Sequence, residues 1–302
     1  MIKIFIATAI LMVSELASAS VSEDDWLETA CVKASLELRK GCEKECFIAR
    51  WEKYKNMCSE TGEYESVLGS YIQAHGNEKE GQEILLKVIK EKGERHDMRL
   101  AYGSLTHSYL SQGNHELAKK YAKEGVVKYP NWYFGYLQYA KCFLAEKQYL
   151  EAKKQLEHSL LIFDREPMTY ALLSAVEYNY RDGSKSIGET MRDTLSLYKK
   201  ALAQGKYKIV FLNKLSVHAG VHSALALNEN KLAAWTLEVF RQWFPEHTKE
   251  PWYKELKDLC SIVFEQRGLK QVFTCEEVQK LFNQNMNPLT VFGEGHLVEK
   301  SD

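Results

Sequence analysis

The fold that we expect for this chain rests on residues 105–130, which read LTHSYLSQGNHELAKKYAKEGVVKYP. Leu105 and Tyr109 lie four residues apart and therefore share one face of a helix. Gly113 and the asparagine after it are typical of a turn, and Ala118 allows a second helix to approach closely before the final proline ends it. The stretch predicts a helical hairpin.

The same pattern recurs on both sides of this hairpin. One copy lies 34 residues later and another 37 residues earlier, a fourth unit begins at Pro167, and a degenerate fifth ends at Pro245. The residues that carry the two neighbouring copies are Tyr139, Phe143, Ala152 and Leu156 on one side, and Leu68, Gly69, Gly76, Gly81 and Leu85 on the other. A fixed period of this length is typical of solenoid proteins. Few glycines and prolines, 17 and 5, also favour long helices and disfavour an all-β fold.

At these residues the sequence resembles the tetratricopeptide repeat family, whose unit of about 34 residues ends on a proline and turns at a glycine. The resemblance covers residues 62–246. It implies an all-α fold, an α-solenoid of helix-turn-helix repeats. The cysteine-bearing segments before and after the array predict disulfide-bonded helical caps at its ends. Two units depart from the pattern: Lys147 stands at the turn glycine of the third, and the fourth carries about eight extra residues between Arg181 and Gly188. A plain helical bundle is the alternative.

In that family, ligands lie along the concave surface formed by the first helix of each repeat. Counting from the matched core positions places ten residues of the chain there: Leu100, His107, Leu110, Phe134, Leu137, Lys141, Leu144, Ala171, Ala175 and Tyr178. Most of them are apolar, so the resemblance implies a partner groove that takes an extended peptide or a helix. The alternative is that neighbouring turns of the superhelix or the C-terminal tail cover these side chains.

Four of the seven cysteines fall close to the N-terminus. If the chain folds back as an antiparallel helical hairpin near residue 44, Cys31 faces Cys58 and Cys42 faces Cys46. We therefore expect the disulfides Cys31–Cys58 and Cys42–Cys46, although four cysteines allow three pairings. A zinc site is the alternative, but only one of the two pairs is close enough in sequence to be typical of structural zinc.

Two further cysteines, Cys260 and Cys275, predict a disulfide between C-terminal helices, which leaves Cys142 as a buried thiol. The domain organisation that we expect is a signal peptide at 1–19, a disulfide-bonded hairpin cap at 20–61, the repeat array at 62–246, a C-terminal helical cap at 247–284 and a flexible tail at 285–302.

Residues 1–19 carry one basic residue, Lys3, then an apolar run and the small residues of a cleavage site that ends at Ala19. Because the apolar run is much shorter than the 20 or so residues that span a bilayer, we expect a cleaved signal and no stable membrane insertion. A retained N-terminal anchor is the alternative. The predicted location is secreted or periplasmic, and this oxidising setting favours disulfides.

The charges exclude some partners and the motifs exclude some chemistry. Forty basic residues balance 41 acidic ones, so no positive field favours nucleic acid. His218 and His222 would share a helical face, but Ala219 stands where a zinc protease has glutamate. No nucleophile elbow and no phosphate-binding loop is present, so we expect no catalytic site, no metal site and no cofactor.

These observations predict a non-catalytic scaffold or assembly factor that binds a protein or peptide in an exported compartment. A structural subunit of a cell-envelope complex is the second reading. An enzyme with accessory repeats is the third. The sequence does not predict an oligomeric state.

Overall fold

The computed structural model describes residues 34, 44–58, 62–75, 77–94, 96–180, 183–205 and 212–266. All elements within these ranges are helical. The predicted signal peptide and tail lie outside them, as do Cys31, Cys42 and Cys275. The chain divides into two compact units, of which the first ends at Asp164 and the second begins at Arg165.

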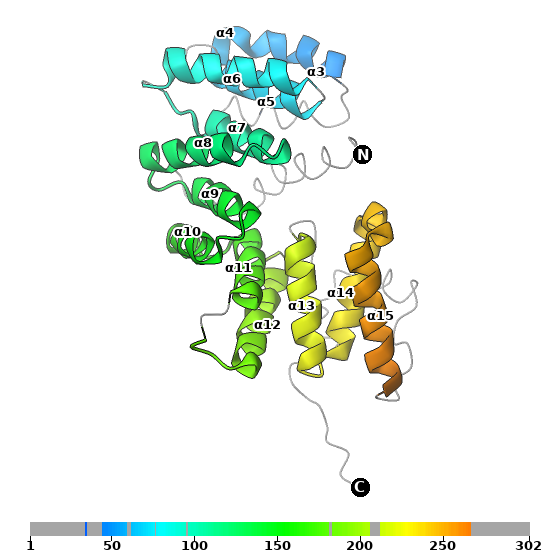
Figure 1. Ribbon diagram of the computed structural model, residues 1–302. Helices are drawn as coiled ribbons and strands as arrows, with labels where there is room; N and C mark the ends of the chain where they lie inside the picture. The colour runs from blue at the N-terminus through cyan, green and yellow to red at the C-terminus, as the bar shows by residue number, and fades with distance from the viewer. Residues whose placement is uncertain are drawn as a thin grey trace. The chain divides into compact units, whose positions relative to one another are not determined.

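The first unit contains three successive antiparallel helix pairs, seen from cyan to green in Figure 1. The pairs are α5 (Glu63–Ala74) with α6 (Glu78–Lys92), α7 (Arg99–Ser111) with α8 (His115–Lys128), and α9 (Tyr133–Ala145) with α10 (Tyr149–Ile162). The first helices α5, α7 and α9 pack side by side, and α6 and α8 each pack against the first helix that follows. The hairpin predicted over residues 105–130 is confirmed.

The turns between paired helices follow local chemistry. Asn77 and Asn114 each precede a second helix, and their side chains accept hydrogen bonds from backbone N–H groups of its first turn at 3.3 and 3.2 Å. Gly113 has φ of 74°, a conformation that glycine adopts without steric cost. In the third pair Lys147 takes the same left-handed conformation, with φ of 59°.

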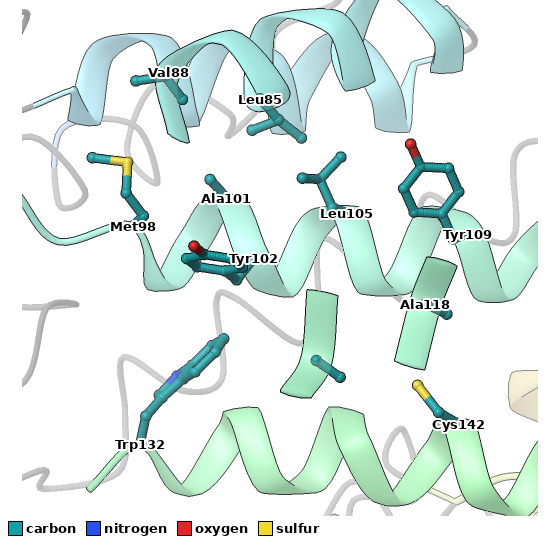
Figure 2. Packing of buried hydrophobic residues seen from close by; sticks show 11 residues of the cluster. Leu85, Val88, Met98, Ala101, Tyr102, Leu105, Tyr109, Ala118, Trp132 and Cys142 are labelled. Carbon is teal, nitrogen blue, oxygen red and sulfur yellow. The ribbon is translucent and has the colours of Figure 1, made fainter. Parts of the chain in front are cut away.

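The core of the first unit lies between successive pairs. Figure 2 shows Leu85 and Val88 of α6 facing Ala101 and Leu105 of α7, all at most 2% exposed. Within the first pair the backbones come very close: a Cβ on Gly81 would lie 2.6 Å from the carbonyl oxygen of Gly69. The glycine pattern of the sequence therefore corresponds to a close helix crossing.

Hydrogen bonds between the pairs repeat the sequence period. The hydroxyl groups of Ser70 and Ser104 are hydrogen-bonded to each other, and Gln112 Nε2 donates to a Glu78 carboxylate oxygen at 3.2 Å. Both contacts join residues 34 positions apart. Equivalent positions of neighbouring repeats thus touch directly.

The N-terminal segment, α3 (Lys44–Trp51), η2 (Glu52–Tyr54) and α4 (Lys55–Cys58), packs against α5. Its aromatic rings carry the contact. Phe47 stacks on Tyr71 with ring centroids 3.7 Å apart, and Trp51 stacks on Tyr64 at 5.6 Å. The Trp51 indole also donates a hydrogen bond to the Tyr64 carbonyl at 3.2 Å. The segment therefore shares a buried aromatic cluster with α5, and its role as a cap stays a prediction.

Cys46 and Cys58 are each disulfide-bonded. They lie 12 residues apart along nearly continuous helix, which corresponds to roughly 18 Å, so they are not bonded to each other. The predicted partners are Cys42 and Cys31, which lie outside the described residues, and both pairings stay predictions.

The second unit contains α11 (Pro167–Asn179) with α12 (Ile187–Gln204), α13 (Lys214–Ala226) with α14 (Asn230–Trp243), then η4 (Pro245–Lys249) and α15 (Pro251–Gln266). The first helices again pack together, α11 on α13 and α13 on α15. Lys185, in the long connection before α12, donates to Glu177 and Asp193 at 2.5 and 2.7 Å. The predicted insertion in the fourth repeat is therefore held by ion pairs.

The predicted Cys260–Cys275 disulfide is wrong, because the Cys260 thiol is free. Helix α15 turns Cys260 toward α13 and α14 with Trp252, Tyr253 and Leu256, which recur at helical spacing and are all at most 6% exposed. Tyr253 fixes this face by donating a hydrogen bond to the Leu237 carbonyl at 2.9 Å. Cys260 is therefore a core residue of the second unit and not half of a disulfide.

Candidate functional site

The residues predicted to line the partner groove are divided between the two units. In the first unit, Leu137 and Leu144 are 1% and 8% exposed, so both belong to the buried interior. Leu100 is half-buried against the aromatic cluster of the N-terminal segment. The remaining predicted residues of this unit, His107, Leu110, Phe134 and Lys141, are also half-buried, and we call these four the α7–α9 patch.

The α7–α9 patch lies across two helices that pack side by side. Phe134 of α9 lies next to Gly103 of α7, with one ring atom 3.7 Å from the place where a Cβ at residue 103 would be. Leu110 and Phe134 rest on the core cluster of the unit, each with part of its surface accessible. His107 lies close enough to Lys141 for the two charges to interact.

Burial sets the charge of the imidazole in this patch. It lowers the pKa of His107 to about 4, and the Lys141 ammonium group acts in the same direction. His107 is therefore neutral at pH 7. The positive charge of the patch then comes from Lys141.

Gln138 is a residue of this surface that the sequence analysis missed. It lies on α9 between Phe134 and Lys141 at helical spacing, and only 3% of its surface is exposed. Its side-chain oxygen Oε1 has no hydrogen-bond partner. A buried acceptor of this kind costs free energy until a donor reaches it. The one signal in the sequence is a polar residue inside an apolar helix.

In the second unit, Ala171 and Ala175 are buried, at 0% and 1% exposed. Tyr178 of α11 is half-buried and meets the two histidines that the sequence analysis placed on one helical face. Its ring centroid lies 5.7 Å from that of His218 and 5.8 Å from that of His222, both on α13. The two imidazole centroids are 4.4 Å apart. We call these three residues the imidazole cluster.

Both imidazoles of this cluster are neutral at pH 7. Burial lowers the pKa of His222 to about 4, and the neighbouring His218 adds to the effect. Burial also lowers the pKa of His218, although Glu255 of α15 opposes the change.

The thiols of the described residues are not activated. Burial raises the pKa of Cys142 to about 12, and its thiol donates a hydrogen bond to the Gln138 carbonyl at 3.4 Å. Burial raises the pKa of Cys260 to about 12 as well. Neither is a thiolate near neutral pH, and a nucleophilic cysteine needs that form. The expectation that Cys142 is a buried, free thiol is confirmed.

Metal-binding clusters and membrane-spanning helices are both absent from the described ranges. They contain no group of three or more His, Cys, Asp or Glu side chains placed to hold a metal ion. None of the helices found there combines the length and the apolar character that a membrane span requires.

Comparison with known proteins identifies the fold. No protein-family model matches the sequence, and no curated protein does. Among solved structures, Pseudomonas aeruginosa PilF superposes with a TM-score of 0.58 at 16% identity, covering 76% of this chain and 96% of PilF. A chain of the APC/C hetero-tetramer Cut9–Hcn1 superposes with a TM-score of 0.60 at 14% identity, covering 88% of this chain.

The fold is a tetratricopeptide-like α-solenoid. The chain spans 48% of the length of the APC/C chain that it matches. At these identities the likeness extends to the fold alone. The predicted architecture of helix-turn-helix repeats is confirmed. The comparisons do not identify a partner surface.

Proposed function

We propose that the protein is a non-catalytic scaffold or assembly factor, which binds a protein or peptide through the α7–α9 patch. One observation carries the proposal. Leu110 and Phe134 are apolar side chains on neighbouring helices and stay partly accessible. On α9, Gln138 lies between Phe134 and Lys141 at helical spacing, and its buried side-chain oxygen has no hydrogen-bond partner. That combination is unfavourable for a surface that stays bare and favourable for one that is covered.

The chemistry of the patch favours an extended segment as the ligand. Covering Leu110 and Phe134 gains about 25 cal/mol for each Å² of apolar surface removed from water. An extended backbone also offers N–H groups that could reach Gln138, whereas the N–H groups inside a helix are already hydrogen-bonded. An acidic side chain in the segment would gain from Lys141.

We also propose that the protein acts outside the cytoplasm, in a secreted or periplasmic location. The support is the basic, apolar and small-residue pattern of residues 1–19. N-terminal sequencing of the protein purified from its native cell should begin at Ser20. A chain that begins at Met1 or Ile2 would contradict export by this signal.

The binding surface is tested by a pair of matched double variants. Leu110→Glu with Lys141→Glu changes the α7–α9 patch. Val127→Glu with Leu161→Glu changes two exposed residues of second helices, 73% and 83% exposed, and adds the same two glutamates. We expect partner recovery from the native compartment to fall at least tenfold for the first pair only, with helical circular dichroism retained in both.

The second candidate function is a structural subunit of a cell-envelope complex. It is favoured by the large exposed fractions of Val127 on α8 and Leu161 on α10. Such apolar residues on second helices would fit a permanent contact outside the patch. If the second pair of changes abolishes recovery and the first does not, this function replaces the scaffold.

A further inference from the structure

His218 and His222 are both half-buried, and their ring nitrogens have no hydrogen-bond partner among the described residues. The two residues lie one turn apart on α13, and their ring centroids are 4.4 Å apart. Neither imidazole takes part in any hydrogen bond or ion pair of the described residues. The ring contacts with Tyr178 are packing contacts, and they do not supply a hydrogen-bond partner to the nitrogens.

We propose that His218 and His222 together bind one divalent transition-metal ion of the class that prefers imidazole ligands, namely Zn²⁺, Cu²⁺ or Ni²⁺. Residues four apart on a helix project from the same face, so both rings can reach one ion. Two nitrogens bound tetrahedrally at 2.0–2.1 Å would be roughly 3.3 Å apart. The ring centroids are 4.4 Å apart, so the rings have to separate slightly to bind one ion in this geometry.

The neighbourhood of the pair favours a cation on balance. The carboxylate of Glu255 on α15 lies within electrostatic reach of His218. Lys214 acts against a cation, but its ammonium group lies 3.9 Å from a Glu250 oxygen and 5.6 Å from the centroid of the Trp252 ring. The nearest positive charge is thereby partly compensated. Hard cations such as Mg²⁺ and Ca²⁺ are not expected, since they prefer oxygen ligands.

The site supplies two protein ligands. The described residues offer no third His, Cys, Asp or Glu in position, so water or atoms of a bound molecule would complete the coordination. An ion with open positions can therefore join the second unit to a ligand that brings its own donor atoms. Metal binding requires only ligand atoms and no catalytic glutamate. The absence of the zinc protease pattern therefore does not count against this site.

Calorimetric titration of the chelator-treated full chain with ZnCl₂ tests the site. We expect one ion per site and at least tenfold weaker binding in His222→Gln. The matched control is His247→Gln, which removes a histidine that already interacts with Glu246 and Glu250. The control should bind as tightly as the unaltered chain. Equal affinity in the unaltered chain and in His222→Gln, or no saturable binding in either, would overturn the proposal.

A second variant keeps the test independent of folding defects. His222→Cys puts another metal donor at the same place and should restore binding, whereas a loss of packing alone would affect Cys and Gln alike. Electron paramagnetic resonance of one equivalent of bound Cu²⁺ should report two nitrogen ligands in the unaltered chain and one in His218→Gln. Nitrogen coupling that does not change in His218→Gln would place the ion elsewhere and refute the assignment.

Discussion

At Gly220 of α13, the ring of Tyr198 from α12 occupies the space where a side chain would begin. A Cβ at this position would lie 2.6 Å from two atoms of the ring. Tyr198 is fully buried, and its hydroxyl group is hydrogen-bonded to Thr236 at 3.2 Å. The ring is held at both ends and cannot swing aside.

We therefore expect Gly220→Ala to lower the free energy of unfolding by about 1–3 kcal/mol, the usual cost of overpacking a core. Urea denaturation at pH 7 measures the change. The matched control is Gly188→Ala on α12, where the nearest atom is the flexible Arg192 guanidinium at 3.6 Å. The control should leave stability unchanged or raise it by up to about 1 kcal/mol. A Gly220→Ala protein as stable as the control would show that Tyr198 can move.

His107 predicts a loss of stability in mild acid. Its pKa is lowered to about 4 in the folded chain, whereas an unfolded histidine titrates near 6.5. Between these values the unfolded chain binds the additional proton, so stability falls as the pH drops from 6.5 toward 4. The slope from one such group is at most about 1.4 kcal/mol per pH unit. Urea midpoints at pH 7, 6 and 5 measure it.

In His107→Gln this part of the pH dependence should disappear, and the midpoints should fall less steeply between pH 6.5 and 4. His158→Gln, on α10, is the control for removing any histidine of the first unit. Parallel pH profiles for the unaltered chain and His107→Gln would contradict the buried, neutral imidazole.

At the scale of elements, α3 is joined to α5 by stacked aromatic rings, of which Phe47 and Tyr71 are the closest pair. Phe47 is 0% exposed and its ring lies flat on Tyr71, with an interplanar angle of 13°. A column of packed rings is stiff, and it replaces the contacts that an end repeat otherwise lacks.

We expect Phe47→Ala to cost about 3–5 kcal/mol of local stability, because it removes a buried aromatic side chain. Hydrogen exchange should accelerate strongly in α5 and only weakly in α9, since repeats couple mainly to their neighbours. Lys53→Ala, which changes an exposed residue of η2, is the control. Equal acceleration in α5 and α9 would show that the first unit opens as a single block.

Most helices of the repeats could be predicted because their signals are local. The small residues Gly69 and Gly81 and the turn at Gly113 each specify backbone geometry directly, and all three have the predicted role. The groove was harder to predict. Helical spacing indicates which face a residue occupies but not how far the next helix covers it, so Leu137 and Leu144 proved buried.

The imidazole cluster was also only partly predictable from the sequence. The spacing of His218 and His222 identifies a shared face. The proximity of Tyr178, which lies about 40 residues earlier on another helix, is a tertiary contact that no local pattern encodes. Likewise, the repeat pattern runs through residue 164 without a break, so the sequence does not indicate the division into two units.

At the scale of the whole molecule, the cysteine inventory differs from the one that the sequence predicts. Cys46 and Cys58 are each bonded to a separate partner, and Cys142 and Cys260 are free. If both partners are other cysteines of this chain, the two disulfides use four of its seven cysteines and leave three thiols. The sequence analysis pairs six and leaves one.

We expect thiol titration of the denatured, unreduced protein to report three thiols, and the native protein to react slowly at Cys142 and Cys260 because both are buried. Mass spectrometry of the alkylated peptides identifies the sites. A count of one, with Cys260 protected after denaturation, would restore the disulfide to Cys275. Reduced, denatured protein, in which all seven thiols are accessible, is the control for complete alkylation.

The contacts between residues 34 positions apart also determine how the first unit would unfold under mechanical force. Ser70 to Ser104 and Glu78 to Gln112 cross the border between hairpins, so a hairpin that loses them comes away as a whole. Stretching 34 residues releases roughly 115 Å of contour at about 3.4 Å per residue. The folded hairpin occupies only about 10 Å of that length, the diameter of a helix. A chain pulled from its ends would therefore act as a spring that lengthens in discrete steps, each set by the sequence period.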